Sequence, residues 1–223
     1  MDIERLRSNY AKILEKINKS AIKSGRKSSD VEVIVVTKKV CAEIINVLNE
    51  LGIKHLGENR PLDGAEKKAC VKTGFVWHII GHVQTNKAKA VAHNFDVIHS
   101  IDSMKLAGEL NKHLVPIDKK MDAYLEINIS GEESKLGIKP EQLKNILFEI
   151  RSQFKNLNPI GLMTMAPISE DPELIRYVFK NLKKLADEVL LKSLSMGMSQ
   201  DFAVAIEEGA TAVRIGTAMF EGV

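Results

Sequence analysis

Short apolar segments rich in β-branched residues alternate with amphipathic helical patterns along the whole chain, and this alternation limits the possible folds more than any other feature. The predicted strands lie in residues 33–37, 53–56, 75–80, 95–100, 123–129, 159–165, 191–195 and 212–215. The predicted helices are 2–24, 44–51, 62–72, 84–93, 103–114, 140–150, 172–190 and 199–208. Such alternation predicts a parallel sheet, and eight units in 223 residues predict an α/β fold closed as a (β/α)8 TIM-type barrel.

The helix at 2–24 precedes the first strand and is therefore additional to the repeating units. After the last strand only residues 217–223 remain, which is too short for a full covering helix, so we expect the N-terminal helix to pack there. No linker, repeat or low-complexity segment interrupts the chain. We therefore expect residues 1–223 to form a single barrel domain.

Composition excludes several classes of protein. The net charge is +3 with 27% charged residues, so the sequence gives little reason to expect a nucleic-acid partner. Cys41 and Cys70 are far apart and form no metal-binding or disulfide pattern, which is typical of a reducing compartment. The N-terminus lacks the apolar segment of a signal peptide, and no run approaches the roughly 18 apolar residues of a membrane span. A cytoplasmic protein without a membrane partner is expected.

Two lysines, Lys38 and Lys39, follow the first predicted strand, Val33–Thr37. Burial of that strand is expected to desolvate at least one ammonium group, and desolvation beside a like charge lowers a lysine pKa toward the nucleophilic range. This makes Schiff-base chemistry possible. The alternative is that both lysines are solvated surface charges beyond the end of the strand.

The loops after strands seven and eight are where a TIM barrel commonly binds phosphate. Ser199 follows strand seven at the predicted start of a helix, where it can act as the N-cap. Gly216 and Thr217 follow strand eight and offer close backbone approach, an N–H group and a hydroxyl. Each feature alone is typical of an ordinary cap or turn. Together, at two predicted positions, they indicate a phosphate site.

A lysine amine and a phosphate site at one end of a barrel indicate a ligand with both a carbonyl group and a phosphate. Pyridoxal 5'-phosphate (PLP) and sugar phosphates both satisfy this requirement. Arg214, near the end of strand eight, is a donor that accepts no proton, so beside a pyridine nitrogen it would leave that nitrogen unprotonated. Its alternative role is a strand-end arginine paired with a helix carboxylate.

Motifs distributed from the first strand to the C-terminus resemble the pyridoxal-phosphate homeostasis (YggS/PROSC-like) family. They are Val35-Val-Thr-Lys38, Gly57-Glu-Asn59, Trp77-His-Ile-Ile-Gly81, Gln84-Thr-Asn-Lys87, His99-Ser-Ile-Asp102, Asn128-Ile-Ser130, Ser134-Lys-Leu-Gly-Ile138, Gly161-Leu-Met-Thr-Met165, Ser195-Met-Gly-Met-Ser199 and Val213-Arg-Ile-Gly-Thr-Ala218. The resemblance implies the barrel of the N-terminal domain of alanine racemase, with PLP bound as a lysine aldimine. It also implies a role in intracellular PLP and amino-acid homeostasis, by storage, delivery or sensing.

By this resemblance Lys38 forms the imine, Arg214 faces the ring nitrogen, and Ser199, Gly216 and Thr217 hold the phosphate. The family continues Gly-Glu-Asn with tyrosine, whereas Arg60 and Pro61 follow here, which leaves the contacts of that loop open.

Four further residues are candidates for the pocket by position alone. Asn59, Met163, His78 and Asn128 lie at or near strand ends, where they could line the pocket. His78 and His82 are four residues apart, but they are expected on a strand and in the loop that follows it. At this spacing the two side chains do not reach the same ion there, so no metal is expected. The pairs Lys67-Lys68 and Lys183-Lys184 are expected on solvated helix faces.

The resemblance implies little or no catalysis, so no residue is assigned a catalytic role. Alanine racemase uses a second proton donor held by a further β domain, which does not follow Thr217 here, and an unprotonated pyridine nitrogen stabilises a carbanion poorly. Slow racemisation or transamination is the most that we expect. The alternatives are a Schiff-base enzyme acting on an amino acid or a sugar phosphate, and a binding module. The expected partners are PLP, amino acids and PLP-dependent apoenzymes, with the protein itself a monomer.

Overall fold

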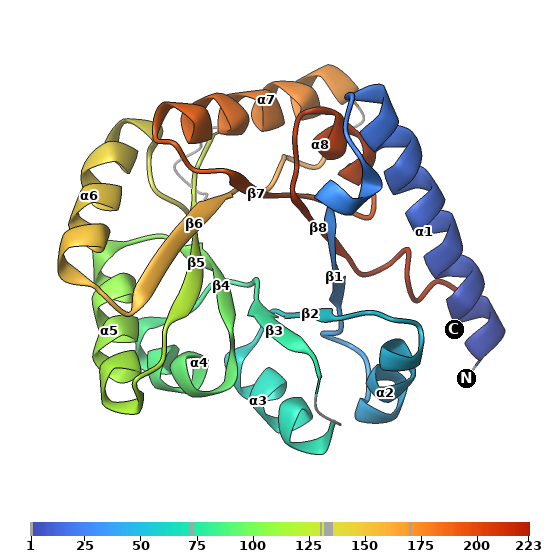
Figure 1. Cartoon of the computed structure of the whole chain (residues 1–223), viewed down its shortest axis with the longest axis horizontal. Helices are drawn as coiled ribbons and strands as arrows, with labels where there is room; N and C mark the ends of the chain where they lie inside the picture. Colours follow the sequence, from blue (N-terminus) through green and yellow to red (C-terminus); the bar gives the residue numbers. More distant parts are fainter. Residues whose placement is uncertain (1, 72–73, 130, 132–135, 170) are drawn as a thin grey trace.

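Eight parallel strands form a closed barrel in a computed structural model that describes residues 2–71, 74–129, 131, 136–169 and 171–223 (Figure 1). The strands pair in chain order, and β8 returns to pair with β1. Their bounds are β1 Glu32–Val36, β2 His55–Glu58, β3 Val76–Ile79, β4 Val97–Ile101, β5 Met121–Glu126, β6 Leu157–Met163, β7 Ser193–Met198 and β8 Ala212–Ile215. The predicted TIM-type barrel is confirmed, and the predicted bounds of β8 coincide with the observed ones.

Helices surround the barrel as an outer layer (Figure 1). The α-helices are α1 Ile3–Lys23, α2 Ala42–Glu50, α3 Pro61–Cys70, α4 Ala88–Asn94, α5 Met104–Leu114, α6 Leu143–Gln153, α7 Pro172–Glu188 and α8 Phe202–Glu207. Short 3-10 segments are η1 Ser28–Asp30, η2 Thr85–Lys87, η3 Val115–Ile117 and η4 Pro140–Gln142. None of the described helices is long and apolar enough to cross a membrane.

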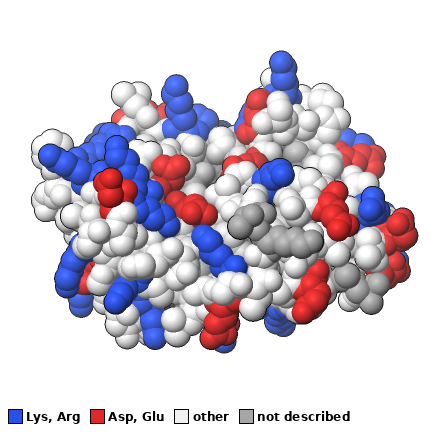
Figure 2. All heavy atoms as spheres, turned by 60° about the horizontal axis from the view of Figure 1, so that its bottom comes forward, with Lys and Arg blue, Asp and Glu red and all other residues white. Residues whose placement is uncertain are grey.

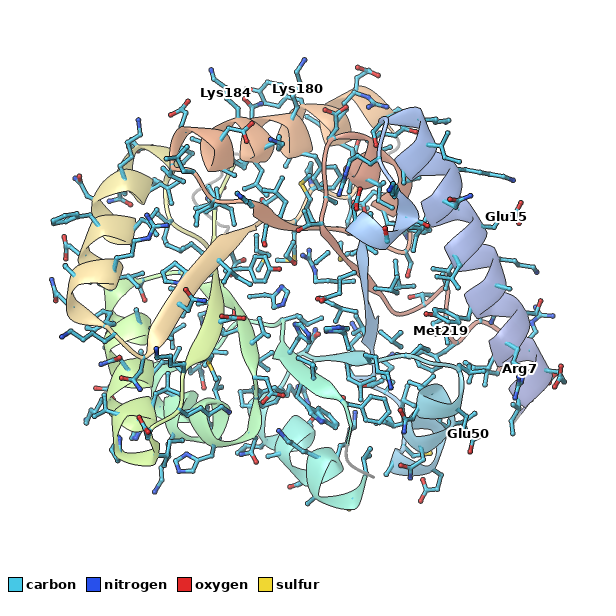
Figure 3. All side chains as sticks on the ribbon, viewed as in Figure 1. Arg7, Glu15, Glu50, Lys180, Lys184 and Met219 are labelled. Atoms are coloured by element: carbon cyan, nitrogen blue, oxygen red, sulfur yellow. The ribbon has the colours of Figure 1, made fainter. Side chains whose placement is uncertain are left out.

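The main hydrophobic core lies between the strands and the helices. Each helix contributes one apolar face to it, as the period of 3.6 residues requires. On α7, Phe179 and Leu182 are fully buried, whereas Lys180 and Lys184 point away from the barrel on the opposite side (Figure 3). The arrangement leaves the barrel interior to side chains that alternate inward along the strands.

The N-terminal helix α1 packs beside α8 at the place where a helix after β8 would lie (Figure 1). Leu6 and Ile17 on its inner face are buried. The Asn9 side-chain amide donates to the backbone carbonyls of Met219 and Glu221 at 3.1 and 2.9 Å, and Figure 3 shows Met219 near α1. The expected position of the N-terminal helix is therefore confirmed.

Candidate ligand site at the carboxyl ends of strands one, seven and eight

The chain turns immediately after β1. This strand ends at Val36, and Lys38 and Lys39 occupy the centre of a turn closed by the Val40 N–H, which donates to the Thr37 carbonyl at 2.9 Å. Both lysine side chains are exposed, so the expected desolvation is wrong for this structure. The strand ends one residue earlier than predicted, and strand alternation therefore does not decide the directions of the two lysine side chains.

The residue before Lys38 is held by a buried polar group. Thr37 donates its hydroxyl to the Glu58 carboxylate at 2.7 Å, and the Lys67 ammonium donates both to that carboxylate at 2.8 Å and to the Thr37 carbonyl at 2.6 Å. Glu58 is 1% exposed. The prediction that Lys67 lies on a solvated helix face is wrong, because its side chain is 17% exposed and pairs with Glu58 on β2. These contacts fix the base of the Lys38 turn.

A second turn follows β7. The Met198 N–H donates to the Asp201 carboxylate at 2.6 Å, and the Asp201 N–H donates to the Met198 carbonyl at 3.1 Å. Helix α8 begins only at Phe202, with Asp201 as the preceding residue, so the prediction that Ser199 is the N-cap is wrong. The short, buried side chain of Asp201 closes this turn instead.

Ser199 joins the loop after β7 to the segment after β8. Its hydroxyl oxygen accepts a hydrogen bond from the Ala218 N–H at 3.2 Å. Thr217, directly before Ala218, is exposed, and Gly216 is half-buried. The Met219 N–H donates to the Gly216 carbonyl at 2.9 Å, which forms a tight turn over these residues. Hydroxyl and amide groups from two loops thus lie together, as an anion site requires.

This turn also lies beside the end of β1. Val35 is opposite Ile215 in the register between β1 and β8. A Cβ atom added to Gly216 would have its nearest contact, 3.4 Å, with Cβ of Val36, and Lys38 follows Val36 by two residues. The Lys38 turn and the Gly216 turn are therefore at the same end of the barrel, on neighbouring strands.

Arg214 is buried, on the strand that leads to the Gly216 turn, at 4% exposure. It donates to the Ser195 hydroxyl at 2.6 Å and to the Thr164 carbonyl at 3.1 Å. Burial lowers its pKa to about 10, with the nearby carboxyl groups of Asp201 and Glu126 opposing the shift. The guanidinium therefore remains a cation and a pure donor at neutral pH. It forms no ion pair with a helix carboxylate among the contacts described.

Hydrogen-bonded side chains continue from Arg214 through the barrel interior. Ser195 Oγ lies 2.8 Å from His99 Nδ1, and His99 Nε2 lies 2.9 Å from His78 Nδ1. Ser195 is on β7 and His99 on β4, which are not neighbouring strands, so this contact spans the lumen. Tyr124 stacks on His99 with 4.3 Å between ring centroids. Burial lowers the pKa of His78 and His99, which keeps both rings neutral.

The remaining predicted pocket residues have different surroundings. Met163 ends β6 but is 1% exposed and packs inside the barrel with Val97 and Tyr124. His78 is also interior. Asn59 is half-buried next to Gly81, where an added Cβ would lie 2.4 Å from the Asn59 carbonyl oxygen. These contacts place Met163 and His78 in the barrel interior and Asn59 at the close crossing of the loops after β2 and β3.

Asn128 follows β5 and accepts a hydrogen bond from the Gly131 N–H at 3.0 Å through its side chain. Three residues of the quoted motifs, Ser130, Ser134 and Lys135, lie outside the described residues. Arg60 and Pro61, where the family pattern changes, begin α3. Pro61 is in the first turn, where its missing N–H costs no helical hydrogen bond, and Arg60 is exposed.

Charged groups also surround the barrel opening after β3, β4 and β5. His82 lies 3.1 Å from Asp102, and burial together with Asp102 raises the pKa of Glu126. A hollow of about 500 Å³ beside His82 and Asp102 is lined in part by Leu136 and Gly137. Across the face drawn in Figure 2, acidic side chains stand among the lysine and arginine side chains, in keeping with the nearly balanced composition.

The arrangement is suited to a ligand with a carbonyl group, a phosphate and a hydrogen-bond-accepting ring atom. The Ser199–Ala218 contact brings hydroxyl and N–H groups of two loops together beside the Lys38 turn, as the phosphate of PLP requires. Arg214 is fixed nearby by two acceptors. The donor set fits the group, since phosphate requires N–H and O–H donors and a pyridine nitrogen without a proton requires one donor.

Sequence comparisons match the whole length of this chain. The profile of the family described as "Alanine racemase, N-terminal domain" matches residues 1–222. A pyridoxal phosphate homeostasis protein of Aquifex aeolicus is 41% identical over 94% of this chain and 95% of its own.

Solved structures agree with this match. PipY of Synechococcus elongatus, whose structure has PLP bound, is 32% identical with a TM-score of 0.80, covering 86% of this chain and 92% of its own. An alanine racemase of Clostridium difficile shares the fold at 17% identity and a TM-score of 0.75, covering 97% of this chain and 55% of its own. The chain thus belongs to the pyridoxal phosphate homeostasis protein family, built on the barrel of the alanine racemase N-terminal domain.

Proposed function

We propose that this protein binds PLP in a single domain, residues 1–223, with the Lys38 amine condensed to the cofactor aldehyde, and serves PLP and amino-acid homeostasis. One observation supports this most directly. The Ser199–Ala218 hydrogen bond joins the loops after β7 and β8. Strand β8 pairs with β1, the strand that leads into the Lys38 turn. The presence of PLP in the related PipY structure supports the same ligand.

Each site residue has a role that its surroundings support. Ser199, Gly216 and Thr217 hold the phosphate through hydroxyl and backbone N–H groups, because Arg214 is already committed to Ser195 and Thr164 and faces the ring nitrogen. Asn59 supports the pocket from the loop after β2. Met163 supports the pocket from the barrel interior, where it packs against Val97 and Tyr124.

Exposure of Lys38 supports a carrier in particular. An exposed lysine can exchange its cofactor with solvent or with a partner, whereas a deeply buried one exchanges slowly. Bound PLP supplies an electron sink, and Arg214 weakens that sink because a guanidinium can donate to the ring nitrogen but cannot accept a hydrogen bond from its protonated form. We therefore propose storage, delivery or sensing of PLP, with racemisation or transamination at most slow.

The proposal extends to partners and location. Amino acids are the proposed sensed ligands, and PLP-dependent apoenzymes the proposed recipients, with the protein acting as a monomer. The two cysteines, Cys41 and Cys70, are both free and exposed, which supports a reducing compartment such as the cytoplasm.

The decisive experiment compares Lys38→Ala with Lys39→Ala. The two lysines are neighbours in one turn and are both exposed, so the substitutions are matched in position and in their expected effect on stability. Protein reconstituted with PLP should show the visible absorbance of a Schiff base and a borohydride-reducible adduct. Both signals should disappear in Lys38→Ala and persist in Lys39→Ala.

Two outcomes would contradict the proposal. Loss of the signals only in Lys39→Ala would move the covalent link to the other lysine. A colourless protein that is not reconstituted by PLP, yet is trapped by borohydride on a sugar phosphate, would favour the sugar-phosphate alternative.

A further inference from the structure

A second cluster of ionisable side chains lies at the opposite, amino-terminal end of the barrel. Glu32 begins β1 and His55 begins β2, and His78 enters the same space from β3. His55 Nδ1 lies 3.0 Å from His78 Nε2, and His55 Nε2 lies 3.2 Å from a Glu32 carboxylate oxygen. The other Glu32 oxygen lies 4.0 Å from His78 Nε2. One ligand atom from each residue falls within 4.8 Å of the other two.

Charges in this cluster are not balanced. Among the described residues, Glu32 has ion-pair contacts only with the two histidines and none with a lysine or arginine. A bound cation would compensate this carboxylate, and neutral imidazoles are the form that binds a metal.

The ring of His78 is oriented for such a role by its other nitrogen. When Nε2 faces the cluster, the proton of His78 lies on Nδ1 and donates to His99 Nε2 at 2.9 Å. His99 then donates from Nδ1 to Ser195 Oγ at 2.8 Å, and this oxygen also accepts from Arg214. Each ring keeps a partner in this arrangement. A metal-binding histidine ordinarily has its second nitrogen held in this way.

Solvent reaches the cluster from outside the barrel. A hollow of about 430 Å³ is lined by Glu32 and His55 and by residues around them, including Asp30 and Lys54. The side chains of Glu32 and His55 are 35% and 27% exposed, whereas that of His78 is 3% exposed. An ion entering through the hollow would meet the two accessible ligands first and the buried one last.

We propose that Glu32, His55 and His78 form a binding site for one divalent transition-metal ion of the zinc class, separate from the ligand site at the other end of the barrel. Two imidazoles and one carboxylate favour zinc, cobalt or nickel over magnesium and calcium, which prefer all-oxygen sites. Three protein ligands also leave a coordination position open toward the hollow for water.

The test uses the full chain, stripped with a chelator and titrated with Co²⁺, followed by Zn²⁺. Co²⁺ should give a visible ligand-field spectrum that saturates at one ion per chain, and Zn²⁺ should displace it. Glu32→Gln, His55→Gln and His78→Gln should each weaken Zn²⁺ binding by about tenfold or more in calorimetry. Because Glu32 and His55 are partly exposed, their variants keep the test valid if the His78 variant does not fold, as judged by circular dichroism.

His113→Gln is the matched control. His113 Nε2 lies 3.9 Å from a Glu109 carboxylate oxygen on the surface of α5. The substitution therefore removes a histidine beside a carboxylate without changing the cluster. It should leave Zn²⁺ binding unchanged. Absence of saturable binding, or equal losses in His55→Gln and His113→Gln, would overturn the proposal and leave the cluster as a hydrogen-bonded chain in the barrel interior.

Discussion

At the scale of single residues, the site depends on which donors are already committed. Arg214 has acceptors within the protein for both terminal nitrogens, Ser195 Oγ and the Thr164 carbonyl, and is buried. It therefore has a fixed direction and little freedom to follow a phosphate. Thr217 is exposed and lies in the Gly216 turn, where its hydroxyl can serve a ligand. Phosphate affinity is thus expected to depend on small neutral groups rather than on the arginine.

Thr217→Val tests this division of roles. The change keeps the shape of the side chain and removes one hydroxyl donor to a charged group, which contributes about 1.5 to 3 kcal/mol. PLP should bind about 10- to 150-fold more weakly, as measured by fluorescence or calorimetric titration. Pyridoxal, which lacks the phosphate, should lose little affinity. Equal losses for the two ligands would place the phosphate elsewhere.

At the scale of elements, β7 and the loop after β8 use glycine for different reasons. Gly197, inside β7, has a φ of +94°, and an added Cβ would lie 2.6 Å from Cβ of Ala205 on α8. The position serves the packing of α8 against the end of the strand. Gly216 has no positive φ and only an ordinary contact with Val36. Its lack of a side chain is not needed for folding, which is consistent with a role toward a ligand.

Gly197→Ala and Gly216→Ala should therefore separate stability from binding. Gly197→Ala should lower the free energy of unfolding by about 2 kcal/mol or more, through backbone strain and the clash with α8. Gly216→Ala should change it by less than about 0.5 kcal/mol while weakening PLP binding. Urea unfolding of the ligand-free protein and PLP titration give the two readings. A strongly destabilised Gly216→Ala would mean that this glycine has a folding role.

At the scale of the whole molecule, α1 completes the outer layer. This helix packs beside α8, with the Asn9 side-chain amide donating to the backbone carbonyls of Met219 and Glu221. The two termini consequently lie near each other in Figure 1. The segment after β8, which carries the Gly216 turn, is thus held by contacts more than 200 residues away in sequence.

Leu6→Ala measures how far the barrel depends on this helix. Leu6 is fully buried, so the truncation should lower the free energy of unfolding by about 3 kcal/mol. The neighbouring Arg7→Ala is the control, because the Arg7 side chain is 53% exposed and pairs with Glu4 one turn away. A small effect of Leu6→Ala in urea unfolding would show that α1 is peripheral to the stability of the barrel.

The sequence by itself determined the order of strands and helices, the parallel barrel and the position of α1. Periodicity is a local property, and helices alternating with parallel strands have one common closed arrangement at this length. It also located the Lys38, Ser199 and Gly216 loops at one end of the barrel, since the carboxyl ends of parallel strands meet there. Motif resemblance supplied the ligand.

Only the tertiary structure decided which polar groups meet. Lys67 and Lys68 are identical neighbours in sequence, but the fold brings Lys67 to the buried Glu58, nine residues away on another element, and Lys68 to the Asn94 carbonyl. Asp201 rather than Ser199 closes the turn before α8, because helix ends shift by a few residues with local hydrogen bonding. Glu32, His55, His78 and His99 come from four strands, and nothing in their spacing predicts the contacts that barrel closure and strand register create between them.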